Sequence, residues 1–338
     1  MGSFRWRRGL IAVLIVNAVI WPTCLFAQSQ PSPTASDRSN RVSIAYVPPE
    51  NSALQELYDF LRAHRALEQI QEILSPLRSP EELTIKTMEC KEVNSWYTRE
   101  KSKSIVTICY EYLKRILESL PSEGNSDGLT PADAAVGQFI WVTLHEVGHA
   151  TFDILDLPIF GHSEDAADNF ATYIMLQFGE GQAHRLIAGA AWAWRAYLGD
   201  YKKNPVVPLR LSAFGTDHSL PQERFYNLIC LAHGADSVGF ADFANYLPPT
   251  RAPGCAFEYR ILVRAFEKEI TPHVDQEIAR RVLDTNWLST TGGGTGSPEI
   301  AMSLYGPFRK SRDVRVRSGM SGITDISQNV MPGYLFCL

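Results

Sequence analysis

Two histidines and a glutamate interrupt an otherwise apolar run, WVTLHEVGHATF, at residues 141–152. His145 and His149 are four residues apart, so on a helix both side chains lie on one face, about one turn from each other. This spacing lets one nitrogen of each imidazole reach the same metal ion. Glu146 lies about 100° further around the helix, off the line of the histidines but able to reach a water molecule at the metal. The HExxH pattern therefore predicts a zinc site, one ion per chain, with Glu146 as the general base.

The residues around this motif make a chance match a poor explanation. Apolar side chains occupy nearly the whole circumference of the expected helix, as is typical of a buried helix. An ionised glutamate in such a helix is energetically unfavourable unless it is paired or lies near a metal. We expect the helix to begin at Pro131, with Thr130 as its N-cap, and to end at about Leu155.

A catalytic zinc site of this kind needs a third protein ligand and leaves its fourth position open for water. Glu164 follows His149 by 15 residues, in a second expected helix that begins near Ser163 and ends at Gly179. A turn in the segment LDLPIFG would let this helix fold back against the first, and Glu164 would then complete the site. Asp168, one turn further along the same face, could accept a hydrogen bond from the far nitrogen of a ligand histidine and fix its tautomer.

Other roles are open to these and neighbouring polar residues. The acids at the start of the second helix could merely complement the helix dipole behind a cap at Ser163. His162 is an alternative third ligand, although its position beside Gly161 favours a surface loop. Asp153, four residues after His149, could face the metal, but a supporting or helix-terminal role fits it better.

A hydrogen-bond donor for the transition state is the remaining part that such a site would need. Asp217 and His218 precede an expected helix and could supply it, with Arg224 or Tyr226 as substitutes. The alternative is a purely structural role, which is common for a loop histidine beside a helix start. A further aromatic group is better explained by packing than by ligand recognition: Trp192, Trp194 and Tyr197.

These motifs resemble a known group of enzymes. HExxH followed by ExxAD is similar to the glutamate zincins, in the manner of thermolysin and the CAAX proteases. Over roughly residues 42 to 265 the chain also resembles a bacterial family of exported, metallopeptidase-like proteins of unknown function. The segments that carry this similarity are ECKEVNSWY, ICYE, HEVGHA, LPIFGHSEDAADNFAT, DHSLPQERFYNLICL and LPPTRAPGC.

The resemblance implies a site and a fold, but no particular substrate. It implies that His145, His149 and Glu164 are zinc ligands, that Glu146 is the catalytic base and that Asp168 supports a ligand. The implied fold is α+β and mainly helical, a zincin-like metallopeptidase fold. It would comprise a small N-terminal β-sheet, the active-site helix and a helical C-terminal part.

The ends of the chain differ in composition from its middle. Three arginines, an apolar stretch and a small residue at Ala27 predict a signal peptide over residues 1–27. The alternative is an uncleaved membrane anchor at residues 9–27, since this apolar run is nearly long enough to span a bilayer. Residues 28–41 are rich in Ser and Pro, as in a flexible linker. We expect the metallopeptidase domain to cover residues 42–285 and a glycine-rich tail of unknown role to follow over residues 286–338.

Export would place the cysteines in an oxidising compartment, periplasmic or extracellular. Four of them suffice for two disulfides, and sequence alone allows three ways of pairing them. We favour pairing between neighbours in the sequence, Cys90 with Cys109 and Cys230 with Cys255, which leaves Cys337 unpaired. None of the cysteines has the CxxC spacing of a structural zinc site.

Composition and charge narrow the class of partner. The chain of 338 residues is 45% hydrophobic and 20% charged, which is too apolar for wholesale disorder. Its formal charge of −5 becomes −8 when residues 1–27, with three arginines and no acids, are removed. A mildly acidic protein without a long basic stretch is not expected to bind nucleic acid. We expect a peptide or protein substrate, and no stable membrane insertion after signal cleavage.

The remaining elements are predicted from periodicity. The expected strands are RVSIAYVPP, LTIKTMEC and KSIVTICYEYL. The last of them runs into a helix that ends near Leu120. Apolar residues from Ser52 to about Leu74 fall near helical spacing. Further helices are expected over EGQAHRLIAGAAWAWRAYL, after Pro221, and within residues 256–283. By analogy with zincins, the strand KSIVTICYE would be the sheet edge along which an extended peptide lies.

The predicted chemistry is hydrolysis of a peptide bond by water that zinc makes acidic and Glu146 deprotonates. One rival function is a zinc hydrolase that acts on another kind of amide. The other is a binding protein that keeps the fold and the metal but has no useful turnover. The intact His145, Glu146 and Glu164 argue against such a silent site, which would typically carry substitutions there.

Overall fold

The computed structural model describes residues 40–285 and 287, with gaps at residues 102, 121–127 and 196–210. The expected signal peptide and the expected glycine-rich tail lie outside these residues, as does nearly all of the linker. Tyr197 also lies outside them.

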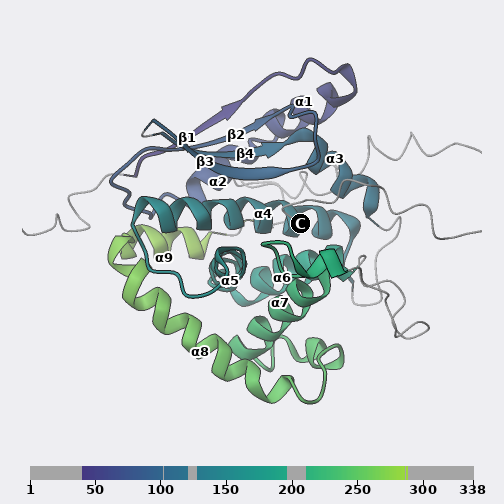
Figure 1. Cartoon of the computed structure of the whole chain (residues 1–338), viewed down its shortest axis with the longest axis vertical. Coiled ribbons are helices and arrows are strands. Elements are labelled where there is room, and N and C mark those ends of the chain that lie inside the picture. The colour runs from purple at the N-terminus through teal and green to yellow at the C-terminus, as the bar shows by residue number, and fades with distance from the viewer. Residues whose placement is uncertain (1–39, 102, 121–127, 196–210, 286, 288–338) are drawn as a thin grey trace, which may run out of the picture. The chain divides into compact units, whose positions relative to one another are not determined.

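A four-stranded sheet forms the N-terminal part of the described chain (Figure 1). Its spatial order is β1-β2-β4-β3, in which β1 and β4 both run parallel to β2 and β3 runs antiparallel to β4. The strands are β1 (Val42–Tyr46), β2 (Leu83–Met88), β3 (Ser95–Glu100) and β4 (Lys103–Cys109). The expectation that KSIVTICYE is an edge strand is therefore wrong, because β4 pairs with a neighbour on each side. Within the described residues, the edges of the sheet are β1 and β3.

Three helices accompany the sheet: α1 (Gln55–Ala63), α2 (Ala66–Ile73) and α3 (Tyr110–Ser119). The apolar periodicity over residues 52–74 belongs to two helices, α1 and α2. Arg65 between them has a φ of 54°, in the left-handed region, and this conformation ends α1 and redirects the chain. The helix α3 follows β4 without a loop, as expected from the sequence.

Helix α4 (Pro131–Ile154) lies between the sheet and three later helices (Figure 1). A capping box fixes its start, because Thr130 Oγ1 accepts from Asp133 N–H and the Asp133 carboxylate accepts from Thr130 N–H. The helix is buried on nearly all sides, as its composition predicts. The helices on its far side are α5 (Ser163–Leu176), α6 (Glu180–Arg195) and α7 (Pro221–Ala235).

Two glycines allow α4 and α6 to approach closely. A Cβ at Gly137 would lie 2.5 Å from the carbonyl oxygen of Leu186, and one at Gly189 would lie 2.2 Å from that of Asp133. Neither backbone position could accommodate a larger residue without separating the helices. The backbones of α4 and α6 therefore lie in direct contact at these two glycines.

The remaining described chain closes the helical part with α8 (Cys255–Ala265), a π-helical turn (Phe266–Ile270) and α9 (Gln276–Asp284). The sheet with its helices and the later helical part share one hydrophobic core cluster. The expected mainly helical α+β class is thus confirmed. None of the helices among the described residues has the length and hydropathy needed to cross a membrane.

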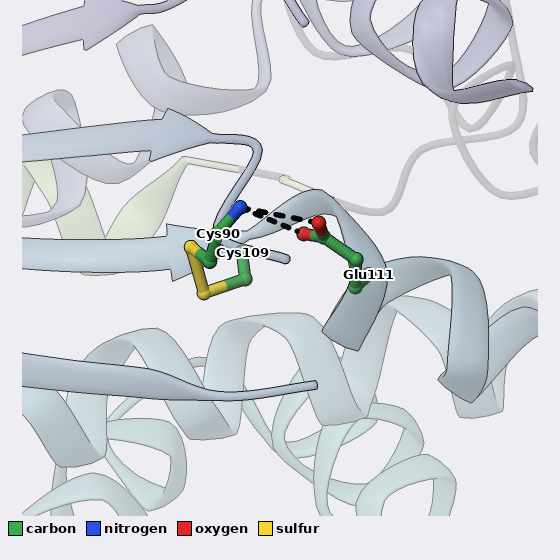
Figure 2. A group of neighbouring side chains, drawn as sticks. All are labelled: Cys90, Cys109 and Glu111. Atoms are coloured by element: carbon green, nitrogen blue, oxygen red, sulfur yellow. Dashed lines mark hydrogen bonds between the residues drawn. A yellow bond between two sulfur atoms is a disulfide. The ribbon is translucent and has the colours of Figure 1, made fainter. Parts of the chain in front are cut away.

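Disulfides join both expected pairs, Cys90 with Cys109 and Cys230 with Cys255. The disulfide between Cys90 and Cys109 is next to Glu111, whose carboxylate accepts a hydrogen bond from the backbone N–H of Cys90 (Figure 2). The same carboxylate accepts a second hydrogen bond from the backbone N–H of Lys91. Lys91 has a φ of 64°, so Glu111 stabilises a turn in an uncommon backbone conformation. Although two cysteines and a glutamate converge here, both sulfurs are committed to the disulfide, and the group is structural rather than a metal site.

Candidate metal centre

Two helices and the loop that joins them bring the predicted zinc ligands together. Helix α4 carries His145, Glu146 and His149, and α5 carries Glu164 and Asp168. The loop between these helices reverses the chain direction at two residues with positive φ: Asp156 (51°) and Gly161 (100°). Glu164 thereby faces the histidines across the helix pair, as the turn in LDLPIFG predicts.

The three candidate ligand atoms form a nearly equilateral triangle. His145 Nε2 lies 3.2 Å from His149 Nε2 and 3.1 Å from Glu164 Oε2, and His149 Nε2 lies 3.3 Å from the same oxygen. Tetrahedral zinc with ligands at about 2.0–2.1 Å separates neighbouring donor atoms by about 3.3–3.4 Å. Two imidazole nitrogens and one carboxylate oxygen are also a known donor set for catalytic zinc. The chemistry and the spacing of these atoms therefore fit one zinc ion.

Electrostatics favour a cation at this point. Burial opposes ionisation of Glu164, but hydrogen bonds from His145, His149 and His218 hold its pKa far below the ordinary range. Burial would lower the pKa of His145, which is only 1% exposed, yet hydrogen bonds to Asp168 and Glu164 raise it to about 9. Positive charge, whether carried by protons or by a metal ion, is thus stabilised between the two imidazoles.

Asp168 supports His145 from behind. The Nδ1–H of His145 donates to Asp168 Oδ1 at 2.7 Å, which directs Nε2 toward Glu164. Arg224 on α7 donates to both oxygens of Asp168, and its guanidinium carbon lies over the rings of both Trp141 and Trp194. Burial would raise the pKa of Asp168, but Arg224 and His145 lower it, so the carboxylate remains ionised.

Arg224 is therefore not a donor to a reacting group, the role considered for it from the sequence, because it is buried behind Asp168. Tyr226 packs edge-on against Phe225. Trp194 is fully buried, which agrees with the packing role expected for the aromatic group.

His218 reaches the centre from the loop before α7. Its Nε2 lies 2.7 Å from Glu164 Oε2, and its Nδ1 lies 2.9 Å from the carboxylate of Asp217. Two further contacts attach this loop to the start of α5. Ser219 Oγ donates to Asp165 at 2.6 Å, and His162 Nδ1 lies 3.2 Å from the carbonyl oxygen of Asp217.

The two alternative candidates are engaged elsewhere. His162 is exposed and contacts the loop backbone, so it has the surface position expected for it. The carboxylate of Asp153 accepts hydrogen bonds from Tyr97 Oη and Arg99 Nη1 on β3. This contact attaches the end of α4 to the edge strand.

The segment that builds this centre is similar to a known protein family. Residues 46–269 match the model of a family described as "Putative metallopeptidase". The chain belongs to this family. No curated protein and no solved structure matches it. The family match confirms the resemblance to a metallopeptidase-like family, and the matched residues include the whole of the centre.

In this member of the family, the sequence does not reveal one close neighbour of Glu146. Ser95, at the start of β3, is fully buried and donates from Oγ to Glu146 Oε1 at 3.0 Å. Glu146 itself is 1% exposed. The segment NSWY belongs to the resemblance described above, but only the packing of β3 against α4 reveals what the serine contacts.

A cleft of about 510 Å³ opens onto these groups. The cleft is lined by Glu146, His149 and Glu164, together with side chains of β3 and of the loop between α4 and α5. Its volume lies within the range of about 300–1,000 Å³ that is common for ligand sites. The candidate metal centre is thus accessible from solvent through a cleft large enough for part of a substrate.

Proposed function

We propose that this protein is a zinc-dependent metallopeptidase in which His145, His149 and Glu164 bind one zinc ion. The triangle formed by the donor atoms of these residues, with sides of 3.1–3.3 Å, carries the proposal. Membership of a metallopeptidase family supports the reaction class. Zinc bound there would polarise the carbonyl group of a substrate and make water more acidic.

Glu146 is the general base in this proposal. Its Oε1 accepts from Ser95, so the carboxylate is fixed in orientation while the residue still lines the cleft. Glu146 would take a proton from the attacking water and deliver it to the departing amine. A carboxylate that is buried and oriented by one hydrogen bond is suited to this shuttle.

His218 would stabilise the negative charge that develops on the substrate oxygen. Its ring lies beside Glu164, and Asp217 contacts the other ring nitrogen and can fix its orientation. Nε2 faces Glu164 Oε2 here, so it would have to turn from this oxygen to the substrate oxygen to stabilise the developing charge. The hydrogen bond of Asp168 with His145 would keep the Nε2 of this ligand aimed at the metal.

An extended peptide would bind along the free edge of β3. Cys109 N–H donates to the carbonyl of Asn94, so backbone groups alternate between facing β4 and facing away from it. By this alternation the N–H and C=O of Tyr97 point away from β4. Tyr97 also lines the cleft, so a peptide paired with its backbone would lie beside Glu146 and His149.

Export is part of the proposal. Two disulfides are typical of proteins from oxidising compartments, which agrees with the signal peptide expected over residues 1–27. The domain would then comprise residues 42–285, preceded by a linker and followed by the glycine-rich tail.

The decisive experiment measures zinc by elemental mass spectrometry in the purified mature chain and in two variants. We expect about one zinc per chain, loss of zinc affinity in Glu164→Ala, and retention of zinc in Glu146→Gln. Digestion of a peptide library should occur with the unmodified chain and not with Glu146→Gln. A folded protein that binds no zinc after exposure to the ion would overturn the metal site. Undiminished digestion by Glu146→Gln would instead overturn the role of the base.

A further inference from the structure

The loop between α4 and α5 exposes an unusual run of apolar side chains. Within residues 157–160, Ile159 is 37% exposed and Phe160 is 97% exposed. Exposed runs of this kind are unfavourable in a soluble domain unless they serve a binding function. The loop is anchored at both ends by α4 and α5, so its position relative to the metal centre is fixed by the helix pair.

This loop forms one wall of the cleft that contains the catalytic groups. Leu157 and Ile159 line the cleft from the loop, Phe152 lines it from α4, and Trp96 lines it from β3. Glu146, His149 and Glu164 line the same cleft. An apolar surface is therefore continuous with the place where the bond would be cut.

Part of the acidic charge of this wall is already neutralised. Asp153 accepts hydrogen bonds from Tyr97 at 2.5 Å and from Arg99 at 3.1 Å, so its carboxylate is occupied. Asp156 is exposed, which places a second acid in the lining where water can solvate it. Apart from these acids, the candidate metal centre and Ser163, the lining is aromatic and aliphatic: Trp96, Tyr97, Phe152, Leu157 and Ile159.

We propose that this cleft is a specificity subsite for a large apolar side chain, aromatic or leucine-like, of a peptide next to the cleaved bond. The inference rests on the proposed peptidase function and assigns its substrate class. Trp96, Phe152 and Ile159 line the cleft and would contact this side chain. A volume of about 510 Å³ accommodates an aromatic side chain together with its flanking backbone.

The first test is digestion of a proteome-derived peptide library by the zinc-loaded chain. The second measures kinetics on matched peptides that differ only in carrying Phe, Ala or Lys at the preferred position. The unmodified chain should favour large apolar residues at one position beside the cut. Ile159→Ser and Trp96→Ala should each lower kcat/KM for the Phe peptide about tenfold and leave the Ala peptide nearly unaffected. Phe257→Ser is the matched control, because Phe257 is an exposed phenylalanine of α8 that does not line the cleft.

Binding to the Glu146→Gln variant gives a second readout that does not depend on turnover. The Phe peptide should bind about tenfold more tightly than the Ala peptide, and Ile159→Ser should abolish this difference. Equal binding of the two peptides, or tighter binding of the Lys peptide, would overturn the subsite whatever the catalytic result. Selective binding of the Phe peptide without hydrolysis by the unmodified chain would support the subsite and count against the proposed peptidase function.

Discussion

Arg224 holds Asp168 through two hydrogen bonds, from Nε to Oδ2 at 2.7 Å and from Nη2 to Oδ1 at 2.6 Å. Both side chains are buried, and Asp168 also accepts from His145 Nδ1–H. Arginine, aspartate and histidine thus form a line that ends at the candidate metal centre. The arginine fixes the carboxylate, and the carboxylate fixes the tautomer and direction of the imidazole.

Removing the carboxylate should weaken metal binding. We expect Asp168→Ala to lower zinc affinity about 10–100-fold, because His145 loses the partner that orients its ring. Asp168→Asn should recover part of this loss, since the amide oxygen can still accept from Nδ1–H. Competition with a chelator of known affinity measures the effect, and equal affinities of all three proteins would show that Asp168 does not support the ligand.

Removing the arginine should instead reduce the stability of the fold. We expect Arg224→Met to lower the free energy of unfolding by about 3–5 kcal/mol, because it leaves a buried carboxylate without its cation. The double variant Arg224→Met, Asp168→Asn should be more stable than Arg224→Met alone, since no uncompensated charge remains. Denaturant unfolding of the unmodified chain, the two single variants and the double variant tests this, and simple addition of the two single losses would contradict it.

The hydrogen bond from Ser95 to Glu146 should affect turnover more than binding. We expect Ser95→Ala to lower kcat about tenfold with unchanged zinc content, because a lost hydrogen bond to a charged group is worth about 1.5–3 kcal/mol. Ser43→Ala is a suitable control, since Ser43 bonds to Thr84 within the sheet. An unchanged kcat in Ser95→Ala would mean that the serine is only a packing residue.

Local sequence patterns were sufficient for the elements whose causes are local. The HExxH helix, its cap at Thr130 and the strands β1, β2 and β4 follow from periodicity and capping preferences over a few residues. Both disulfides join neighbours in the sequence, so proximity alone favoured the right pairing. The position of Glu164 opposite the histidines also followed, because a short turn joins the two helices.

Long-range packing decided what the sequence could not predict. Strand order is set by contacts between distant segments, so the sequence pattern predicts neither the central place of β4 nor the strand β3. The contact between Ser95 and Glu146 joins residues 51 apart in the sequence. The pattern of α7 does not indicate that Arg224 turns inward, so the sequence leaves it open as a donor to the transition state.

The disulfide between Cys230 and Cys255 should contribute substantially to stability. It joins α7, which carries Arg224, to the first residue of α8, and both cysteines are fully buried. A crosslink that closes a loop of 25 residues is expected to stabilise the fold by about 2–4 kcal/mol. The double variant Cys230→Ala, Cys255→Ala should lose this amount in denaturant unfolding. Unchanged stability would show that packing alone holds α7 against α8.

Tyr110 should make the stability fall at alkaline pH. The side chain is fully buried, its hydroxyl donates to the carbonyl of Val47 at 2.9 Å, and burial raises its pKa from 10.0 to about 12. Above pH 10 the unfolded chain therefore loses this proton while the folded chain keeps it, so the contribution to stability is complete below pH 10 and is lost as the pH rises toward 12.

The loss attributable to this one group between pH 9 and pH 11 is about 1 kcal/mol. We expect Tyr110→Phe to start from a lower stability at pH 9, because a hydrogen bond is missing, but to lose less on going to pH 11. Guanidinium unfolding at both pH values measures how much stability each protein loses between pH 9 and pH 11. Mass spectrometry verifies that the disulfides stay intact. An identical fall in both proteins would mean that Tyr110 does not titrate differently in the folded and unfolded chains.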